Sequence, residues 1–343
     1  MGDLPGLTPR LYRGVRLLLV FATACMLALG AAACGDDDDD EGGGGAAEEE
    51  AQPVRLKVGV IPIADVAPLF LGQKKGFFEE EGITLDPQFA EGGAVILPSV
   101  QSGEFQIGFS NTISLLIAQS QGLPVKIITQ GVLGAENEEN AWGKLLIKGD
   151  GPIRTPQDLE GKKIAVNTLN NICDVTIKAS LEKEGVDVSK LTFQEVPFPE
   201  MVPAISAGRV AAGCVVEPFV SLGESEGLRG LLPFYVNTAP NLTVATYFTT
   251  QDYIDENTDV VERFARAMNR SLDYAAANED EVRGVLTEYT EIPPEAVEQI
   301  QLPQWRQDLN EPTIETLADL SEKYGLVEEA PNVDELIWEG ARQ

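Results

Sequence analysis

Four polar side chains stand close together in this sequence and could bind a small solute by hydrogen bonding. They are Asn167, Thr168, Asn170 and Asn171, and they begin at the last residue of a short, mostly apolar segment at 164–167 that is typical of a β-strand. Capping the next helix requires only one such side chain, so four exceed that need. Amide and hydroxyl groups donate and accept hydrogen bonds without carrying charge. We therefore expect at least one of the four to contact a ligand.

Further candidate contacts follow other predicted strands. Gly92 and Gly93 let the backbone approach a ligand and present N–H groups at a helix start, although a plain turn explains a diglycine equally well. Residues 110–112 could line a cleft or simply cap a helix. Glu217 could accept a hydrogen bond from a ligand or brace an interdomain hinge. The full predicted ligand-binding set is Asp65, Ala67, Gly92, Gly93, Ala94, Ser110, Asn111, Thr112, Asn167, Thr168, Asn170, Asn171 and Glu217.

Several kinds of chemistry are disfavoured by composition. The sequence has no histidine, which argues against a Ser/His or Cys/His hydrolase. Five consecutive aspartates at 36–40 could bind a metal, but a flexible run offers no preformed coordination geometry. The formal net charge of −30 argues against nucleic acid as a partner. We expect no catalytic residue, no metal site and no cofactor.

Cys34 follows a leader of the kind found on bacterial lipoproteins. Three arginines within 10–16 precede an apolar stretch at 17–29, which suits a signal peptide and is short for a membrane span. Alanines at 31–33 provide small residues before a cleavage site. We expect 1–33 to be removed and Cys34 to anchor the protein by lipid to the extracytoplasmic face of the cell membrane, in a periplasm or at a cell surface. The alternative is an ordinary secretory signal with an incidental cysteine.

After this leader the sequence changes character twice. Residues 34–53 are acidic and rich in Gly and Ala, which predicts a solvated, flexible tether. From Val54 onward, short apolar segments alternate with helical ones, which predicts an α/β fold with mainly parallel, doubly wound sheets. The predicted strands lie at 56–61, 83–89, 105–109, 125–130, 164–167, 192–196, 213–216 and 242–249.

These strands suggest two lobes with a ligand crevice between them. We expect 54–145 to form the first lobe, 146–245 the second, and 246–343 to return to the first with C-terminal helices. Crossings near 141–148 and 244–250 would form the hinge. Apolar residues at three- and four-residue steps between Val261 and Ala275 predict a helix that packs on a lobe.

Two cysteines, Cys173 and Cys214, fall in the predicted second lobe. The expected helix and strand place them near opposite ends of neighbouring elements, which disfavours a disulfide. We therefore expect both to be buried free thiols, although an exported protein could join them.

Five blocks of sequence resemble the nitrate/sulfonate/taurine-type solute-binding proteins of ABC importers, a family that includes binders of the thiamine pyrimidine precursor. The blocks are APLFLGQKKGFFEEEGI, EGGA, LPSVQSGEFQIGFSNT, DLEGKKIAVN and AISAGRVAAGCVVEPF. The resemblance implies a periplasmic-binding-protein fold whose two lobes are joined by a two-crossover hinge, with the diglycine, the Ser110 loop and the loop after Asn167 facing the ligand. It also implies a small-molecule solute and an ABC permease with its ATPase as partners. We expect a monomer.

The sequence departs from that family inside the predicted crevice. At 167–173, NTLNNIC replaces a more Gly/Ser-rich loop, and at 211–213 Ala-Ala-Gly stands where an aspartate is usual. The strand-end segments contain no Lys or Arg, whereas Asp65 and Glu217 are present. A sulfonate, nitrate or taurine could still be held by helix N-termini and neutral donors. A neutral or amine-bearing solute, such as the pyrimidine precursor, stays equally open.

Three functions compete on this basis. The first is a lipid-anchored receptor that delivers a small polar organic solute to an ABC permease. The second is a sensing ectodomain that works with a separate membrane partner. The third is an enzyme of thiamine-pyrimidine synthesis, which we disfavour because such chemistry would be expected to use a histidine and a reactive lysine in the cleft.

Overall fold

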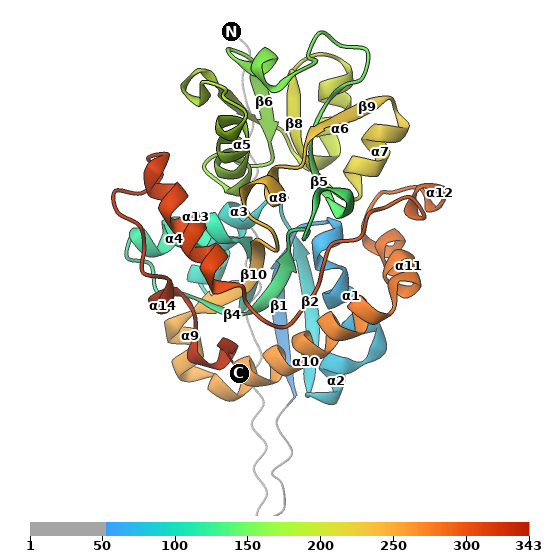
Figure 1. The fold of residues 1–343 in the computed structure, drawn as a ribbon. Helices are drawn as coiled ribbons and strands as arrows, with labels where there is room; N and C mark the ends of the chain where they lie inside the picture. Colours follow the sequence, from blue (N-terminus) through green and yellow to red (C-terminus); the bar gives the residue numbers. More distant parts are fainter. Residues whose placement is uncertain (1–52, 343) are drawn as a thin grey trace, which may run out of the picture. The chain divides into compact units, whose positions relative to one another are not determined.

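The computed structural model describes residues 53–342. The predicted signal peptide, the lipidation site Cys34 and the predicted tether up to residue 52 lie outside the described residues. Within them the chain forms two five-stranded mixed sheets with helices around each (Figure 1). The predicted α/β class with doubly wound lobes is therefore confirmed.

The first sheet has the spatial order β2 (Ile83–Phe89), β1 (Val54–Val60), β3 (Ile107–Asn111), β10 (Thr243–Thr250), β4 (Val125–Leu133). The second has the order β7 (Thr192–Glu195), β6 (Lys163–Val166), β8 (Ala212–Val216), β5 (Gly143–Lys148), β9 (Leu228–Leu232). In each sheet one strand, β10 in the first and β5 in the second, runs antiparallel to both of its neighbours, and the other pairings are parallel. We call the first sheet with its helices the first lobe, and the second sheet with its helices the second lobe.

Helices connect the strands and cover the sheets. In the first part of the chain they are the 3-10 helix η1 (Ala64–Val66), α1 (Ala67–Lys75), α2 (Phe77–Glu80), α3 (Gly93–Gln101) and α4 (Thr112–Ser120). Those of the second lobe and its return crossing are α5 (Ile172–Lys183), α6 (Phe198–Ser206), α7 (Phe219–Ser225) and α8 (Phe234–Thr238). The C-terminal helices are α9 (Gln251–Glu256), α10 (Thr258–Ala277), α11 (Glu279–Tyr289), α12 (Pro294–Val297), α13 (Glu311–Lys323) and α14 (Val333–Leu336).

Because central strands such as β3 and β8 are buried throughout, they consist almost entirely of apolar or small residues.

The two crossings between the sheets lie at 134–142 and 233–242. The sequence prediction placed them at 141–148 and 244–250, which is wrong, because those segments form β5 and β10 inside the sheets. The segment that crosses between the sheets and the strand that follows it are both partly apolar, so the sequence pattern alone does not separate them. We therefore propose lobe boundaries within these crossings in place of 145/146 and 245/246.

The apolar stripe predicted between Val261 and Ala275 forms the buried face of α10. Phe264 lies at its centre, with its ring 5.6 Å from that of Phe78 and 5.7 Å from that of Tyr247, centroid to centroid. This helix therefore joins α2 to the central strand β10, as a packing role predicts.

Cys173 and Cys214 form a disulfide, so the expectation of two free thiols is wrong. Cys173 lies in the first turn of α5, and Cys214 lies in the middle of β8. A helix that follows a parallel strand begins where that strand ends, and β6 runs parallel to β8. The start of α5 therefore lies beside β8, next to the end of β6, and brings the Cα atoms of the two cysteines to 6.0 Å from each other.

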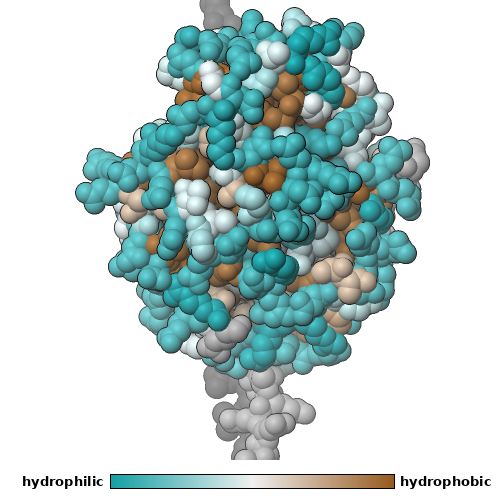
Figure 2. All heavy atoms as spheres, viewed as in Figure 1, coloured by the Kyte–Doolittle hydropathy of each residue, from teal (hydrophilic) through white to brown (hydrophobic). Residues whose placement is uncertain are grey.

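Among residues 53–342, every helix is too short or too polar to span a lipid bilayer. Hydrophilic residues cover most of the face drawn in Figure 2, and apolar residues show through as small, separate areas. The large apolar side chains that are most exposed, Phe89, Val95 and Leu169, lie on segments near the predicted site.

Candidate functional site

The loop after β6 makes a direct contact between the lobes. Asn167 Nδ2 donates a hydrogen bond of 3.1 Å to the carbonyl oxygen of Glu91, in the diglycine segment of the first lobe. Asn171 Nδ2 donates to Asn167 Oδ1 at 2.8 Å and to Thr168 Oγ1 at 3.0 Å. Asn171 also caps α5, because its Oδ1 accepts from the Cys173 N–H. One residue caps the helix, while Asn167 and Thr168 face the opposite lobe.

The two glycines have different neighbours, although they are adjacent in sequence. A Cβ atom on Gly92 would lie 2.8 Å from Asn167 Nδ2 and 3.0 Å from Thr168 Cγ2, both in the second lobe. A Cβ atom on Gly93 would lie 2.0 Å from Ser110 Oγ, in the first lobe. Gly92 therefore permits close approach of the lobes, whereas Gly93 permits close packing of α3 on β3.

Gly92→Ala is expected to weaken solute binding without weakening the fold. The backbone of Gly92 is extended, with φ at 176°, so alanine adds no backbone strain. Its methyl group would hold the lobes apart at Asn167, at a cost to closure of about 1–3 kcal/mol, or roughly 5- to 150-fold in affinity. Calorimetric titration measures the affinity, and a melting curve of the ligand-free protein measures the fold.

Gly93→Ala is the matched control, because its methyl group would collide with Ser110 inside one lobe. We expect a clear drop in melting temperature for this variant. Unchanged affinity in Gly92→Ala would contradict the assignment of Gly92 to the closing surface.

Ser110 and Asn111 belong to β3 itself, because they pair with Thr246 and Ala245 of β10. Asn111 caps α4 by accepting from the Ser114 N–H at 3.0 Å, and Thr112 Oγ1 donates to the Thr243 carbonyl at 2.6 Å. All three predicted residues of this segment are buried and have partners inside the first lobe. Asn111 therefore caps a helix, which was the alternative to lining a cleft. Ser110 lies next to Gly93 of the diglycine.

Asp65 lies in η1, directly after the loop that leaves β1, and only 3% of it is exposed. Its Oδ1 is buried and has no hydrogen-bond partner. Burial raises the pKa of this carboxyl from 3.8 to about 8. The pKa values of Tyr235, Tyr247 and Tyr289 are also raised, first by burial and then by the charge of Asp65. Three tyrosine hydroxyls from three separate elements thus lie within reach of its electrostatic field.

Glu217 lies at the end of β8 and is 1% exposed. Its Oε2 accepts from the Ser221 N–H at 3.0 Å, and its Oε1 accepts from Ser221 Oγ at 2.8 Å and from the Gln301 N–H at 3.1 Å. Burial raises the pKa of this carboxyl to about 7, against the lowering effect of those hydrogen bonds. Its backbone carbonyl accepts from the Ala64 N–H at 2.9 Å, which is a second contact between the lobes. These contacts fit the predicted bracing role.

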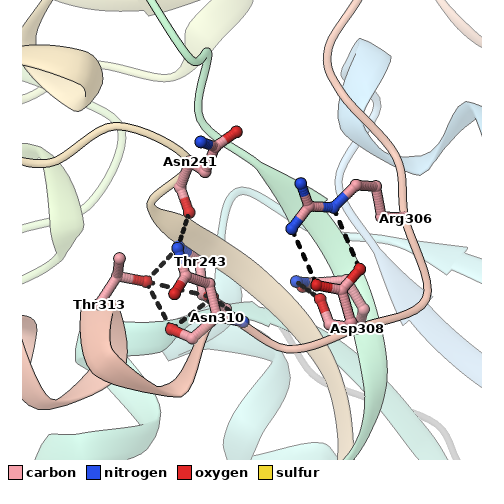
Figure 3. Close-up of polar contacts among 7 residues, drawn as sticks. Asn241, Thr243, Arg306, Asp308, Asn310 and Thr313 are labelled. Carbon is pink, nitrogen blue, oxygen red and sulfur yellow. Dashed lines mark hydrogen bonds and ion pairs between the residues drawn. The ribbon is translucent and has the colours of Figure 1, made fainter.

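Residues 299–310, which we call the strap, connect α12 to α13 and contact both lobes. At one end Gln301 binds Glu217 of the second lobe, and in the middle Trp305 Nε1 donates to the Asp65 carbonyl at 3.2 Å. At the other end Asn310 Nδ2 donates to the Asn241 carbonyl at 2.8 Å, in the second crossing (Figure 3). The strap therefore ties the crevice to the hinge.

Sequence reasoning missed the strap, because it assigned the C-terminal third to helical packing. The signal was present in QLPQWRQDLNEP, where two prolines and a tryptophan interrupt the helical pattern. A tryptophan in such a segment needs both an apolar contact and a partner for its N–H.

A cavity of about 260 Å³ lies between the lobes. The loop after β1 (61–63) and the end of β2 (89–91) line it from one side, and the start of α6 (197–200) lines it from the other. Phe89 and Phe198 provide aromatic walls, and Phe198 stacks on Phe219 at 6.3 Å between ring centroids. The cavity therefore suits a small, largely planar or apolar group. A larger hollow of about 780 Å³ beside the strap contains none of the predicted site residues.

The structure does not gather every predicted residue at this point. Ala67 is buried in the first turn of α1, and Ala94 is exposed on α3. Asn170 is also exposed, and its left-handed backbone, with φ at 54°, suits asparagine. Four predicted residues lie close to the opposite lobe: Asn167, Thr168, Gly92 and Glu217. Asp65 directly follows Ala64, whose N–H donates to Glu217 in the second lobe.

Known proteins share this fold. The alkanesulfonate-binding protein SsuA from Xanthomonas axonopodis pv. citri superposes with a TM-score of 0.71 at 20% identity, over 84% of this chain and 99% of that one. The taurine-binding periplasmic protein of Escherichia coli is 25% identical over 218 residues, which are 64% of this chain and 65% of that protein. This chain thus spans just under two thirds of the length of that relative.

A second kind of relative bears the name of an enzyme. The 4-amino-5-hydroxymethyl-2-methylpyrimidine phosphate synthase THI11 of Saccharomyces cerevisiae is 22% identical over 62% of this chain and 63% of its own length. The family model described as NMT1/THI5 like matches residues 63–282, from the loop after β1 to α11. Because this match covers more than half of the chain, the protein belongs to the NMT1/THI5-like family.

Proposed function

We propose that this protein is the extracytoplasmic solute-binding component of an ABC importer. The observation that carries the proposal is the pair of contacts across the crevice, Asn167 to Glu91 and Ala64 to Glu217. They join lobes that are connected covalently only by two short crossings, so the lobes can separate about those crossings and close again. A solute that contacts both lobes would raise the population of the closed form, which a permease could then recognise.

The relatives support the same function, since the proteins named for taurine and alkanesulfonate binding share the family or the fold. The leader sequence supports export, and Cys34 supports anchoring through lipid at the outer face of the membrane. The predicted acidic tether would let an anchored monomer reach its permease.

An enzyme is the second candidate, because relatives in this family are named as pyrimidine phosphate synthases. Against it stands the absence of histidine from the whole sequence. The buried acids of the crevice, Asp65 and Glu217, have no basic residue placed to act with them as an acid–base pair in the strand-end segments. Binding without covalent chemistry therefore accounts for the site better.

Asn167→Ala tests the proposed binding site. Loss of the amide removes the hydrogen bond to Glu91 and the acceptor of Asn171, so we expect solute affinity to fall about tenfold, equivalent to about 1.4 kcal/mol. Calorimetric titration with whichever compound raises the melting temperature of the wild type gives the affinity. Asn170→Gly is the control, because Asn170 is exposed and glycine adopts its positive φ readily. Equal affinity in Asn167→Ala and the wild type would contradict the proposed site.

A further inference from the structure

A cavity of about 330 Å³ lies in the second lobe, at the end of the sheet that faces away from the crevice. Lys148 ends β5, Lys163 begins β6 and Ala211 directly precedes β8, and all three line this cavity. The other ends of the parallel strands β6 and β8, at Val166 and Val216, lie towards the crevice. The length of β8, about 13 Å, therefore separates the cavity from the crevice. We call it the outer cavity.

The rim of the outer cavity is cationic. Four exposed cations line it, namely Lys148, Lys162, Lys163 and Arg209, and within residues 53–342 no Asp or Glu does. The cavity between the lobes is the reverse, since two glutamates line it and, in the same part of the chain, no Lys or Arg. The whole chain has a net charge of −30, so a cavity lined by cations alone indicates a site for an anion.

Three of the four cations have no partner inside the protein. Within residues 53–342, the side chains of Lys162, Lys163 and Arg209 make no ion pair, no hydrogen bond and no contact with an aromatic ring. Lys57 is the one other Lys or Arg of that part of the chain with no such contact. A ligand can therefore bind these three cations without breaking an internal pair.

The acids near the outer cavity have other partners or are weakly held. Asp158 accepts from two backbone N–H groups, at 2.8 and 2.9 Å. Glu160 pairs with Lys190 at 2.7 Å. Asp150 lies 3.7 Å from Lys148, the fourth cation, and both side chains of this pair are exposed to solvent. Such a pair contributes little, so Lys148 can also turn to a ligand.

The floor of the outer cavity is apolar. Ile153, Ile205 and Val210 line it and are buried, so they lie deeper than the exposed cations. The methylene stems of Lys and Arg can lie along such a floor while their charged ends stay at the rim. A small inorganic anion would contact the rim alone. An anionic group carried on an apolar body would contact both the rim and the floor.

We propose that the outer cavity binds an anionic phospholipid of the membrane surface, with its phosphate at the cationic rim and the start of an acyl chain on the apolar floor. Lys and Arg near an anionic lipid surface strengthen attachment to it. At physiological ionic strength, charges more than about 8 Å away are largely screened, so the acidic remainder of the chain does not prevent this contact. A chain anchored at Cys34 would stay within reach, because the predicted tether 34–53 spans at most about 70 Å.

The two lipid contacts would lie at opposite ends of the molecule. The tether joins β1 at Val54, which is the outer end of the first lobe, because β1 ends at the crevice. The outer cavity lies at the outer end of the second lobe. A chain held at both ends would lie along the membrane surface. This role goes beyond the proposed receptor function and does not depend on the solute.

The test uses the full chain with Cys34→Ser, so that no acyl anchor competes for lipid. Its melting temperature is measured with dihexanoyl phosphatidylglycerol, a soluble anionic phospholipid, below the concentration at which it forms micelles. We expect a rise of about 3 °C at ten times Kd. Dihexanoyl phosphatidylcholine has the same chains without net charge, and inorganic phosphate has charge without chains. We expect neither to raise the melting temperature at matched ionic strength.

Each other result overturns a stated part of the proposal. An equal rise with phosphatidylcholine would contradict the role of the cations. An equal rise with inorganic phosphate would leave a small-anion site and refute the lipid, and an equal rise with a hexaglutamate peptide would indicate an acidic protein partner in its place. No rise with any probe would refute the site. All of these results leave the receptor function standing, because that function is tested with solutes.

Variants then place the lipid at the outer cavity. Arg209→Gln removes one rim cation, and tenfold weaker binding would reduce the rise to about 1 °C at the same lipid concentration. Adding Lys162→Gln and Lys163→Gln should abolish it. Lys57→Gln is the matched control, because Lys57 is an exposed cation on β1 that also lacks a partner, and we expect it to keep the full rise.

These side chains are exposed, so we expect the ligand-free triple variant to melt with the wild type and to bind the solute with unchanged affinity. A full rise with phosphatidylglycerol in the triple variant would place the lipid elsewhere and overturn the assignment.

Discussion

Asp65→Asn is expected to make the ligand-free protein lose less stability than the wild type as the pH rises from 4 to 8. The pKa of Asp65 is raised by burial from 3.8 to about 8. An acid of this kind contributes its full stability below pH 3.8, and this contribution falls as the pH rises towards 8, because the unfolded chain releases its proton first. The loss is roughly 1.4 kcal/mol per pH unit, or about 5 kcal/mol across the range. Asparagine does not titrate, so the variant lacks this slope.

The measurement is the free energy of unfolding at several pH values from 4 to 8, for the wild type and the variant. Glu217, whose pKa is also raised, contributes in the same direction in both proteins, so the difference between the curves isolates Asp65. Asp319→Asn should follow the wild type throughout, because Asp319 is exposed. Parallel curves for Asp65→Asn and the wild type would show that Asp65 is not buried in the ligand-free protein.

Removing the disulfide is the second change with a large expected effect. Cys173 and Cys214 are separated by 41 residues, and closing a loop of that length in the unfolded chain corresponds to about 4 kcal/mol. Both cysteines are buried, so replacing the pair by alanine adds a small packing loss and no buried polar atom. Denaturant unfolding of the double variant should show this decrease.

The wild type unfolded with and without a reductant provides the control. Reduction should lower its stability to near that of the double alanine variant, and should leave the variant itself unchanged. Thiol titration of the unfolded, unreduced protein should detect neither Cys173 nor Cys214. A reductant that leaves the wild-type curve in place would contradict the disulfide.

The fold class could be predicted from sequence because the spacing of apolar side chains that marks a strand or a helix repeats every few residues. Strands such as β1 and β2 and the stripe of α10 are set by side chains a few residues apart. The residues at which strands and helices end were harder to predict from sequence. Ser110 and Asn111 look like loop residues by type, but they extend β3 because β10, more than 130 residues later, pairs with them. Partners at such distances leave no trace in a local pattern.

The same limit explains which residues the sequence could suggest as candidates for the site. Asn167 and Asn171 were identified because more polar groups occurred together than a helix cap needs. The disulfide was missed because it depends on the order of strands in the sheet, with β8 beside β6. Asp65 was selected by its place after a strand, but its burial could not be predicted. Trp305, which donates to its carbonyl, and the three tyrosines whose pKa values its charge raises lie on four other segments of the sequence.

The pairing of β10 between β3 and β4 has a consequence for how this chain acquires its structure during synthesis. Both hydrogen-bonded neighbours of β10 precede it by more than 100 residues, and β4 has no other strand partner in its sheet. Until residue 250 has emerged, β4 and one edge of β3 must stay unpaired, a condition that favours aggregation of nascent chains. The second sheet is complete by Leu232, so we expect the lobe in the middle of the sequence to fold first, before β10 completes the first sheet.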